Sequence, residues 1–363
     1  MKQMLRDESL SSKTQLSLFH LLALAACFAL FAASDAAQTA PFAFPGDKPA
    51  DIPQAWRPLI GEYGLLHPLI VLEKSGKLLL RETDGKEPAL QSAPNGAFTL
   101  IKAPAAPVPV HFGQAPRGHT DYISLDDVRF PRRKLGPEEG QVFQIRPARS
   151  IDQLRQEALA ASPPHESGQF RAPDLVDVAA LNPSIHLDIR YATSDDFLGT
   201  PVYTRARAFL QRPAADALLR ALRRLKPYGY ALLIHDAYRP WYVTKIFWDA
   251  TPPEGKIFVA DPKEGSRHNR GCAVDLTLYE LQAGNPIQMP GTYDEMSPRS
   301  FPDYPGGTSL QRWHRDLLRW AMESEGFAVY GHEWWHFDYK DWREYPILNV
   351  PFEKLQFSEK QVR

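Results

Sequence analysis

Short apolar runs separated by proline and glycine dominate the chain between residues 55 and 150. The runs LIVLE and KLLLRE flank KSG, which predicts a β-hairpin over residues 69–82. Further strands are predicted between residues 97 and 147 by AFTLI, VPVHF, YISLDDVRF and QVFQIRP. Helical spacing over residues 151–160 follows, and we expect this helix to close the region or to start a linker. The pattern predicts a small, mostly β domain over residues 55–160.

Helical and strand patterns are mixed in the second half of the chain. Apolar positions recur at helical spacing in residues 212–225 and in a longer run that Gly326 ends. Pro240 stands at the first helical position of PWYVTKIFWDA. Strands are predicted by the apolar runs YALLIHDA, CAVDLTLYE and EWWHFDY. Together these elements predict an α+β domain over residues 174–363.

The N-terminus combines a basic segment with an apolar run. The run LSLFHLLALAACFALFAA ends in small residues, which is the layout of a secretory signal peptide over residues 1–37. It is also long enough for an uncleaved anchor, and the residues before Cys27 resemble a lipoprotein cleavage box. A proline-rich tether, residues 38–54, comes next. Each alternative places the body outside the cytoplasm, either periplasmic or secreted, with a membrane tether through the N-terminus left open.

Composition and charge narrow the picture further. A length of 363 residues favours two domains, and the prolines of residues 161–173 mark a linker between them. The formal net charge of −1 lacks the electrostatic footprint of a nucleic-acid binder. The only cysteines are Cys27 and Cys272. Loss of Cys27 with a signal peptide would leave no intrachain disulfide, so the exported fold must rest on its core or on a metal.

Candidate chemistry begins at SRHNRGCAVDLTL. Strand periodicity places Asp275 on one face of its run and Cys272 on the apolar face, so Cys272 is expected in the core. A half-buried carboxylate needs a partner or a cation. His268 lies seven residues earlier, in the loop where Gly271 allows the backbone to turn. Taken alone, this spacing favours an ordinary surface turn over a metal pair.

A third potential ligand comes from EWWHFDY. His336 completes a set of three protein ligands with His268 and Asp275, the composition of a catalytic zinc site that keeps one position open. Glu333 is the candidate general base. Because residues three apart face opposite sides of a flat strand, the strand must bend, or Glu333 must precede it. Arg239, in HDAYRP, becomes an oxyanion donor if it turns toward this site, and otherwise is a solvated charge.

These stretches together resemble the zinc D-alanyl-D-alanine dipeptidases of the vancomycin-resistance type, within the wider group of zinc D,D-peptidases and lysostaphin-like enzymes. The resemblance spans residues 174–352 with its motifs in family order. It implies a domain with a central antiparallel sheet flanked by helices. The family pattern Ser-x-His-x-x-Gly-x-Ala-x-Asp is matched by Ser266, His268, Gly271, Ala273 and Asp275, and Glu-x-x-His is matched by Glu333 and His336. The dipeptidase pattern Tyr-Arg-Pro is matched by Tyr238, Arg239 and Pro240, and Asp-x-Arg/Lys-Tyr-Ala-Thr is matched by Asp188, Arg190, Tyr191, Ala192 and Thr193.

The resemblance also implies roles for individual residues. One zinc ion per chain would be bound by His268, Asp275 and His336, with Glu333 as base and proton shuttle and Arg239 stabilising the transition state. Contacts to the substrate's ammonium and carboxylate are implied for Tyr191, Asp236, Ser266 and Asp294. An anionic acceptor suits an ammonium, and a hydroxyl suits a carboxylate.

The implied activity is zinc-dependent hydrolysis of D-alanyl-D-alanine or a related D,D-dipeptide from peptidoglycan metabolism. Two alternatives stay open: a D,D-carboxypeptidase acting on longer muropeptides, and a non-catalytic wall-binding module. A site that is closed around the substrate's amino group would favour the dipeptidase over the carboxypeptidase. The presence of Glu333 and Arg239 speaks against the wall-binding module. The export signal and the additional β-rich domain depart from the compact, cytoplasmic members of the family. The sequence assigns no role to that domain.

Overall fold

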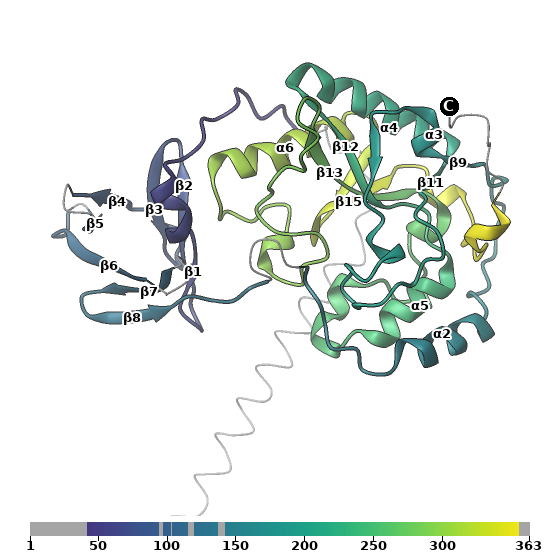
Figure 1. Ribbon diagram of the computed structural model, residues 1–363, viewed down its shortest axis with the longest axis horizontal. Helices are drawn as coiled ribbons and strands as arrows, with labels where there is room; N and C mark the ends of the chain where they lie inside the picture. The colour runs from purple at the N-terminus through teal and green to yellow at the C-terminus, as the bar shows by residue number, and fades with distance from the viewer. Residues whose placement is uncertain (1–41, 94–96, 103, 115–119, 137–141, 356–363) are drawn as a thin grey trace, which may run out of the picture. The chain divides into compact units, whose positions relative to one another are not determined.

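A computed structural model describes residues 42–93, 97–102, 104–114, 120–136 and 142–355 (Figure 1). The described residues belong to one compact unit. The expected signal peptide and Cys27 lie outside the described residues. Among the residues that are described, no helix is both long and apolar enough to cross a membrane.

Eight antiparallel strands form the first sheet, in the simple order β1 to β8. A bridge between Tyr63 and Arg132 pairs the first strand with the segment after the last, so the sheet is nearly closed. The hairpin expected over residues 69–82 is confirmed as β2 and β3, which turn at Ser75 and Gly76, both with positive φ. The strands are β1 Gly61–Tyr63, β2 Leu69–Lys74, β3 Lys77–Arg81, β4 Ala89–Ser92, β5 Phe98–Ile101, β6 Val108–Gln114, β7 Thr120–Leu125 and β8 Val128–Pro131.

The strand expected over residues 141–147 is wrong for the described residues 142–147, which have no regular structure. Phe143 and Ile145 pack instead against the hydrophobic core of the second half of the chain. The alternation of apolar residues there reflects side chains pressed onto another surface rather than strand pairing.

A five-stranded sheet forms the centre of the second half, in the order β10-β12-β13-β15-β14. The α+β class is confirmed, but the sheet is not wholly antiparallel, because β10 pairs with β12 in parallel. A separate pair, β9 and β11, lies beside it. The strands are β9 Leu175–Asp177, β10 Ile185–Leu187, β11 Phe209–Gln211, β12 Tyr230–Asp236, β13 Ala273–Glu280, β14 Phe327–Tyr330 and β15 Glu333–Tyr339.

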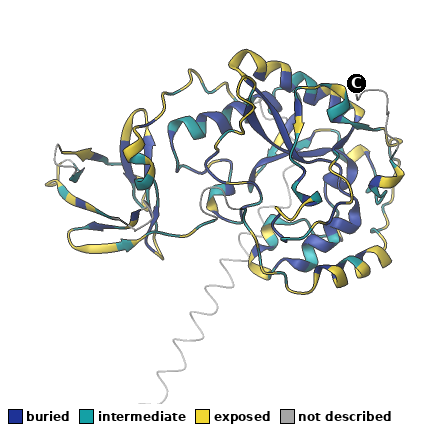
Figure 2. Cartoon of the chain, in the orientation of Figure 1, coloured by how far each residue is buried: buried dark blue, intermediate teal, exposed yellow. Residues whose placement is uncertain are grey.

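The central strands are the most deeply buried part of the molecule (Figure 2). Helices α4 and α6 pack against each other and against this sheet, whereas α2 packs against α5. The buried side chains of α2, Ile151, Leu154 and Ala158, accordingly belong to the core of the second half rather than to that of the β-rich region. The helices are α2 Ile151–Ala160, α3 Val178–Leu181, α4 Arg212–Leu225, α5 Trp241–Ala250 and α6 Ser309–Glu323.

Helix α6 begins with a capping box. Thr308 Oγ1 accepts from the Gln311 backbone N–H, and the Gln311 side chain accepts from the Thr308 N–H. Glu73 of β2 adds a carboxylate there, accepting from the Ser309 N–H at 2.7 Å. A negative group at this end complements the helix dipole.

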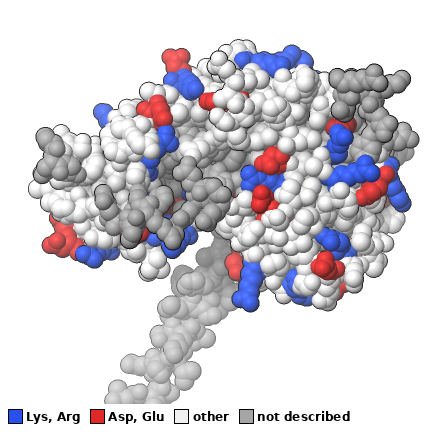
Figure 3. Space-filling view, in the orientation of Figure 1, with Lys and Arg blue, Asp and Glu red and all other residues white. Residues whose placement is uncertain are grey.

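Charged side chains are spread over the surface. Figure 3 shows Lys and Arg close to Asp and Glu across the face in view. The domain boundaries proposed from the sequence stay a prediction, although the described residues contain two separate hydrophobic clusters, one between Tyr63 and Ile123 and one between Ile151 and Phe352.

Candidate active site

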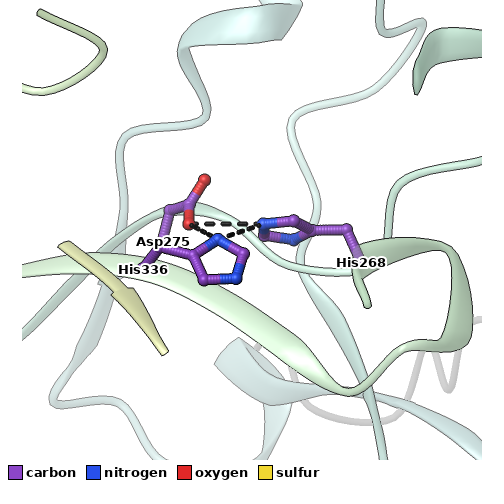
Figure 4. Close-up of side chains that lie close together, drawn as sticks. All are labelled: His268, Asp275 and His336. Atoms are coloured by element: carbon purple, nitrogen blue, oxygen red, sulfur yellow. Dashed lines mark hydrogen bonds and ion pairs between the residues drawn. The ribbon is translucent and has the colours of Figure 1, made fainter. Parts of the chain in front are cut away.

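Three buried side chains converge at the middle of the five-stranded sheet. Asp275 on β13 lies directly opposite His336 on β15 in the strand register. His268 reaches the same point from the turn before β13 (Figure 4). His336 Nδ1 and His268 Nε2 lie 3.0 and 3.3 Å from Asp275 Oδ1. Two nitrogens and one oxygen therefore meet within the span of a single coordination sphere.

Gly271 creates the turn that brings His268 into this cluster. Its φ of 66° is left-handed, a conformation that glycine adopts without steric cost. A Cβ at this position would lie 2.4 Å from Leu175 Cδ2. Both the backbone conformation and the packing thus require glycine between the histidine and the strand.

The surroundings of the cluster fit a metal ion. The outer nitrogen of His268, Nδ1, lies 2.6 Å from the Ala237 carbonyl, and that of His336, Nε2, lies 2.8 Å from Asp338 Oδ1. Outer protons on both rings leave the inner nitrogens with free lone pairs, as metal ligands require. Asp275 Oδ1 is buried with no well-aligned hydrogen bond. Burial alone would raise the pKa of Asp275, but His268 and His336 hold it well below its usual value.

Glu333 lies beside the cluster because β15 bulges. The pairing with β14 jumps from Val329–Phe337 to Tyr330–Glu333, so the extra residues of β15 loop out. Glu333 Oε2 consequently lies 3.8 Å from His336 Nδ1. The bend expected from the Glu-x-x-His spacing is confirmed. Burial raises the pKa of Glu333 to about 8, with His336 opposing the shift.

Arg239 turns inward, not toward solvent. Its Nε and Nη2 lie 2.9 and 2.8 Å from Asp236 Oδ2, and Nη2 lies 3.7 Å from Asp275 Oδ2. The guanidinium stacks over Phe247, 4.6 Å from the ring centroid. Its backbone N–H donates to the His268 carbonyl, which joins the two segments.

Asp294 adds another carboxylate to the wall of the site. Tyr191 donates to Asp294 Oδ1 at 3.0 Å, whereas Asp294 Oδ2 is buried without a partner. Asp294 has a φ of 58°, a left-handed conformation that is uncommon outside glycine, although aspartate adopts it more often than most residues. Burial, followed by repulsion from Asp275, raises the pKa of Asp294 well above its usual value. A cationic group of a ligand would relieve this cost.

The cavity between these groups measures about 90 Å³, well below the roughly 300–1,000 Å³ of drug-sized ligand pockets. Its wall includes His268, Asp275, His336, Glu333, Arg239, Tyr191, Ser266 and Asp294. A small polar molecule is the class of ligand that such a cavity admits.

Sequence comparisons agree with this geometry. The profile of the D-ala-D-ala dipeptidase family matches residues 171–356. The chain belongs to this family. It is 35% identical over 179 residues to a D-alanyl-D-alanine dipeptidase of Escherichia coli (strain K12), covering 49% of this chain and 91% of that protein. It is also 34% identical over 178 residues to a D-alanyl-D-alanine dipeptidase of Enterococcus faecium, covering 43% and 87% respectively.

Of the nine site residues expected from the sequence, Asp236 departs from its expected position in this dipeptidase-family chain. It does not line the cavity. The side chain is fully enclosed and accepts from Arg239, from Tyr203 Oη at 2.6 Å and from the Ala237 N–H. Its carboxylate thus orients Arg239, and the substrate contact expected for Asp236 stays a prediction. The register of β12 shifts between Ile234 and Asp236.

Two residues near the cluster, Tyr293 and Asp338, were not predicted from the sequence to belong to the site. Tyr293 Oη lies 2.9 Å from Tyr191 Oη and 3.2 Å from Asp275 Oδ2, and no sequence pattern indicates a contact from so distant a loop. Asp338 had a signal, since it follows His336 by two residues and strand periodicity places both on one face.

Proposed function

We propose that this protein hydrolyses D-alanyl-D-alanine or a closely related D,D-dipeptide with the help of zinc. The observation that carries the proposal is the convergence of the His268, Asp275 and His336 cluster, Glu333 and Arg239 on one cavity. When bound, zinc would polarise the scissile carbonyl and lower the pKa of water. The family membership and the dipeptidase names of the relatives support the same reaction.

The chain's own residues would supply the remaining chemistry. Glu333, which lies beside the cluster, would accept a proton from the attacking water and return it to the leaving amine. Arg239 donates to the oxygen on which negative charge develops. Asp236 holds that guanidinium in place.

The two ends of the dipeptide have complementary partners. Asp294 and Tyr191 would receive the free ammonium, and the Ser266 hydroxyl would donate to the carboxylate. The small cavity supports a dipeptide with alanine-sized side chains over a longer peptide.

The test is hydrolysis of D-Ala-D-Ala by the purified, zinc-loaded protein. We expect Glu333→Ala to lower kcat by about 10²–10⁴-fold, the usual contribution of a general base. Unchanged activity in this variant would contradict the mechanism. Faster turnover of an N-acylated dipeptide than of the free one would instead indicate a carboxypeptidase, and zinc binding without turnover would indicate a wall-binding module.

We also propose that the protein acts outside the cytoplasm, on dipeptides released from peptidoglycan. The basic and apolar segments of residues 1–37 support export. Mass spectrometry of the mature protein from fractionated cells would distinguish cleavage near Ala37, lipid on Cys27 and retention of the full N-terminus.

A further inference from the structure

Asp294 lies in a turn, Thr292–Ser300, that is stabilised by hydrogen bonds to the neighbouring Glu295. We propose that the ion pair between Glu295 and Arg299 positions Asp294 and thereby sets the preference for dipeptides with a free ammonium. The inference rests on the proposed dipeptidase activity. It assigns Glu295 and Arg299 as positioning residues, which act through Asp294.

Glu295 is completely buried, and both of its oxygens are engaged within the turn. Arg299 donates to it with a fork, Nε to Oε1 at 2.6 Å and Nη2 to Oε2 at 2.7 Å. Thr292 donates to Oε2 from its backbone N–H and its hydroxyl, at 3.1 and 3.0 Å, and the Ser297 hydroxyl donates to Oε1. A buried carboxylate is stable only with such a full set of donors.

Other packing encloses this ion pair. A Cβ on Gly136 would lie 2.5 Å from Glu295 Cδ and 2.6 Å from Arg299 Nη2, so backbone covers the pair closely. At the start of the turn, a Cβ on Gly291 would lie 2.7 Å from the Arg299 carbonyl oxygen. The two ends of the turn thus pack closely together, in addition to the hydrogen bonds at its centre.

The Glu295–Arg299 ion pair matters because Asp294 has an unfavourable backbone conformation. A φ of 58° is uncommon for a residue with a side chain and costs aspartate up to about 1–2 kcal/mol, so the contacts that hold the turn also hold this conformation. The same conformation directs one oxygen to Tyr191 and leaves Oδ2 without a protein partner in the cavity wall. Loosening the Glu295–Arg299 pair would release Asp294 from the position in which it can receive an ammonium.

The alternative is that Glu295 contacts the substrate itself, since it also borders the cavity. Arg299 separates the two ideas because it does not line the cavity. If Glu295 acts only through the pair, Arg299→Gln and Glu295→Gln produce similar losses, and the double variant is little worse than either.

The experiment compares D-Ala-D-Ala with N-acetyl-D-Ala-D-Ala in the full chain. We expect Glu295→Gln and Arg299→Gln to raise KM for the free dipeptide about 10- to 100-fold, the worth of one charge-assisted hydrogen bond, with kcat changed much less. The slow turnover of the N-acetyl compound and the bound zinc should not change. Glu325→Gln, which breaks a pair with Arg220 and Arg224 elsewhere, is the matched control and should leave KM unaltered.

An unchanged KM in both variants would overturn the proposal, as would equal losses for the free and N-acetyl dipeptides. Additive losses in the double variant would assign Glu295 a direct contact instead and also overturn it. If Glu295→Gln fails to fold, Arg299→Lys replaces it as the test, because lysine keeps the charge but cannot make both hydrogen bonds. We expect its KM to lie between those of the unaltered protein and Arg299→Gln. Failure of the unaltered protein to cleave D-Ala-D-Ala would contradict the dipeptidase proposal itself, and calorimetric binding of the two dipeptides would still test the positioning role.

Discussion

Arg239 is held in the cavity by a fork that lysine cannot reproduce. Lysine would keep the charge but offer a single nitrogen to Asp236 and to the substrate. We expect Arg239→Lys to lower kcat about 10²–10³-fold with little change in KM, because its contact strengthens in the transition state. Steady-state kinetics on D-Ala-D-Ala check this, with Arg220→Lys as a control distant from the site. Equal kcat values for Arg239→Lys and the unaltered protein would remove Arg239 from the mechanism.

Asp338 is expected to strengthen metal binding through His336. Removing such an outer partner typically weakens metal affinity about 10- to 100-fold. Asp338→Ala should therefore lower zinc affinity by this factor in competition with a chelator, whereas Asp338→Asn, which still accepts from His336 Nε2, should lose less. If both variants bind zinc as tightly as the unaltered protein, the hydrogen bond has no such role.

For individual residues, the sequence predicted the positions that belong to short motifs. His268, Asp275 and His336 stand at fixed distances from one another in the chain, and strand periodicity placed Cys272 in the core, as the structure confirms. Apart from Asp294, which the resemblance implied, contacts from the turn Thr292–Ser300 were not predictable, because buried hydrogen bonds fix its path and leave no periodic pattern. The ion pair between Asp236 and Arg239 was not predicted either, because the register shift at the end of β12 leaves no mark in the sequence pattern.

Helix α6 is docked on β12 through a buried histidine. His314 Nε2 lies 2.8 Å from Tyr230 Oη, and burial, with a smaller contribution from Lys48, lowers the pKa of His314 to about 4. Between about pH 6.5 and 4 the unfolded chain binds a proton that the folded protein does not, so stability falls as the pH drops. From pH 7 to 5 the loss is about 2 kcal/mol.

Urea unfolding at pH 7 and 5 measures this loss. His314→Gln should be less stable at pH 7 but should lose less on acidification than the unaltered protein. Exposed His186 supplies the control, because His186→Gln should leave the pH dependence as it was. The same acid sensitivity in His314→Gln would show that other groups are responsible.

Element length decides what periodicity can reveal. The helices α4, α5 and α6 and the strands β12, β13 and β15 span 7 to 15 residues, and each was predicted close to its observed bounds. The strands β9, β10 and β11 have three residues each and lie below the length at which a period of two is recognisable. The parallel β10, which makes the sheet mixed, was missed for this reason.

For the molecule as a whole, the placement of α2 decides where the chain can be shortened. A chain beginning at residue 142 keeps α2, whereas one beginning at residue 165 loses Ile151 and Leu154 from the second core. We expect the shorter chain to be less stable by about 3–6 kcal/mol, at about 1.5–3 kcal/mol for each large apolar side chain. Urea midpoints of the two proteins check this, and equal midpoints would show that α2 does not belong to that core.

Cys272 is a chemical reporter that the chain already contains. It is the only cysteine besides Cys27, it is fully buried, and burial raises its pKa to about 12. A thiol reagent reaches it only when the structure opens. Since Cys272 directly precedes β13, its alkylation counts openings of the strand that carries Asp275. Zinc bound there should slow the labelling by the factor 1 + [Zn]/Kd, so occupancy of the site becomes readable as a mass shift on one sulfur atom.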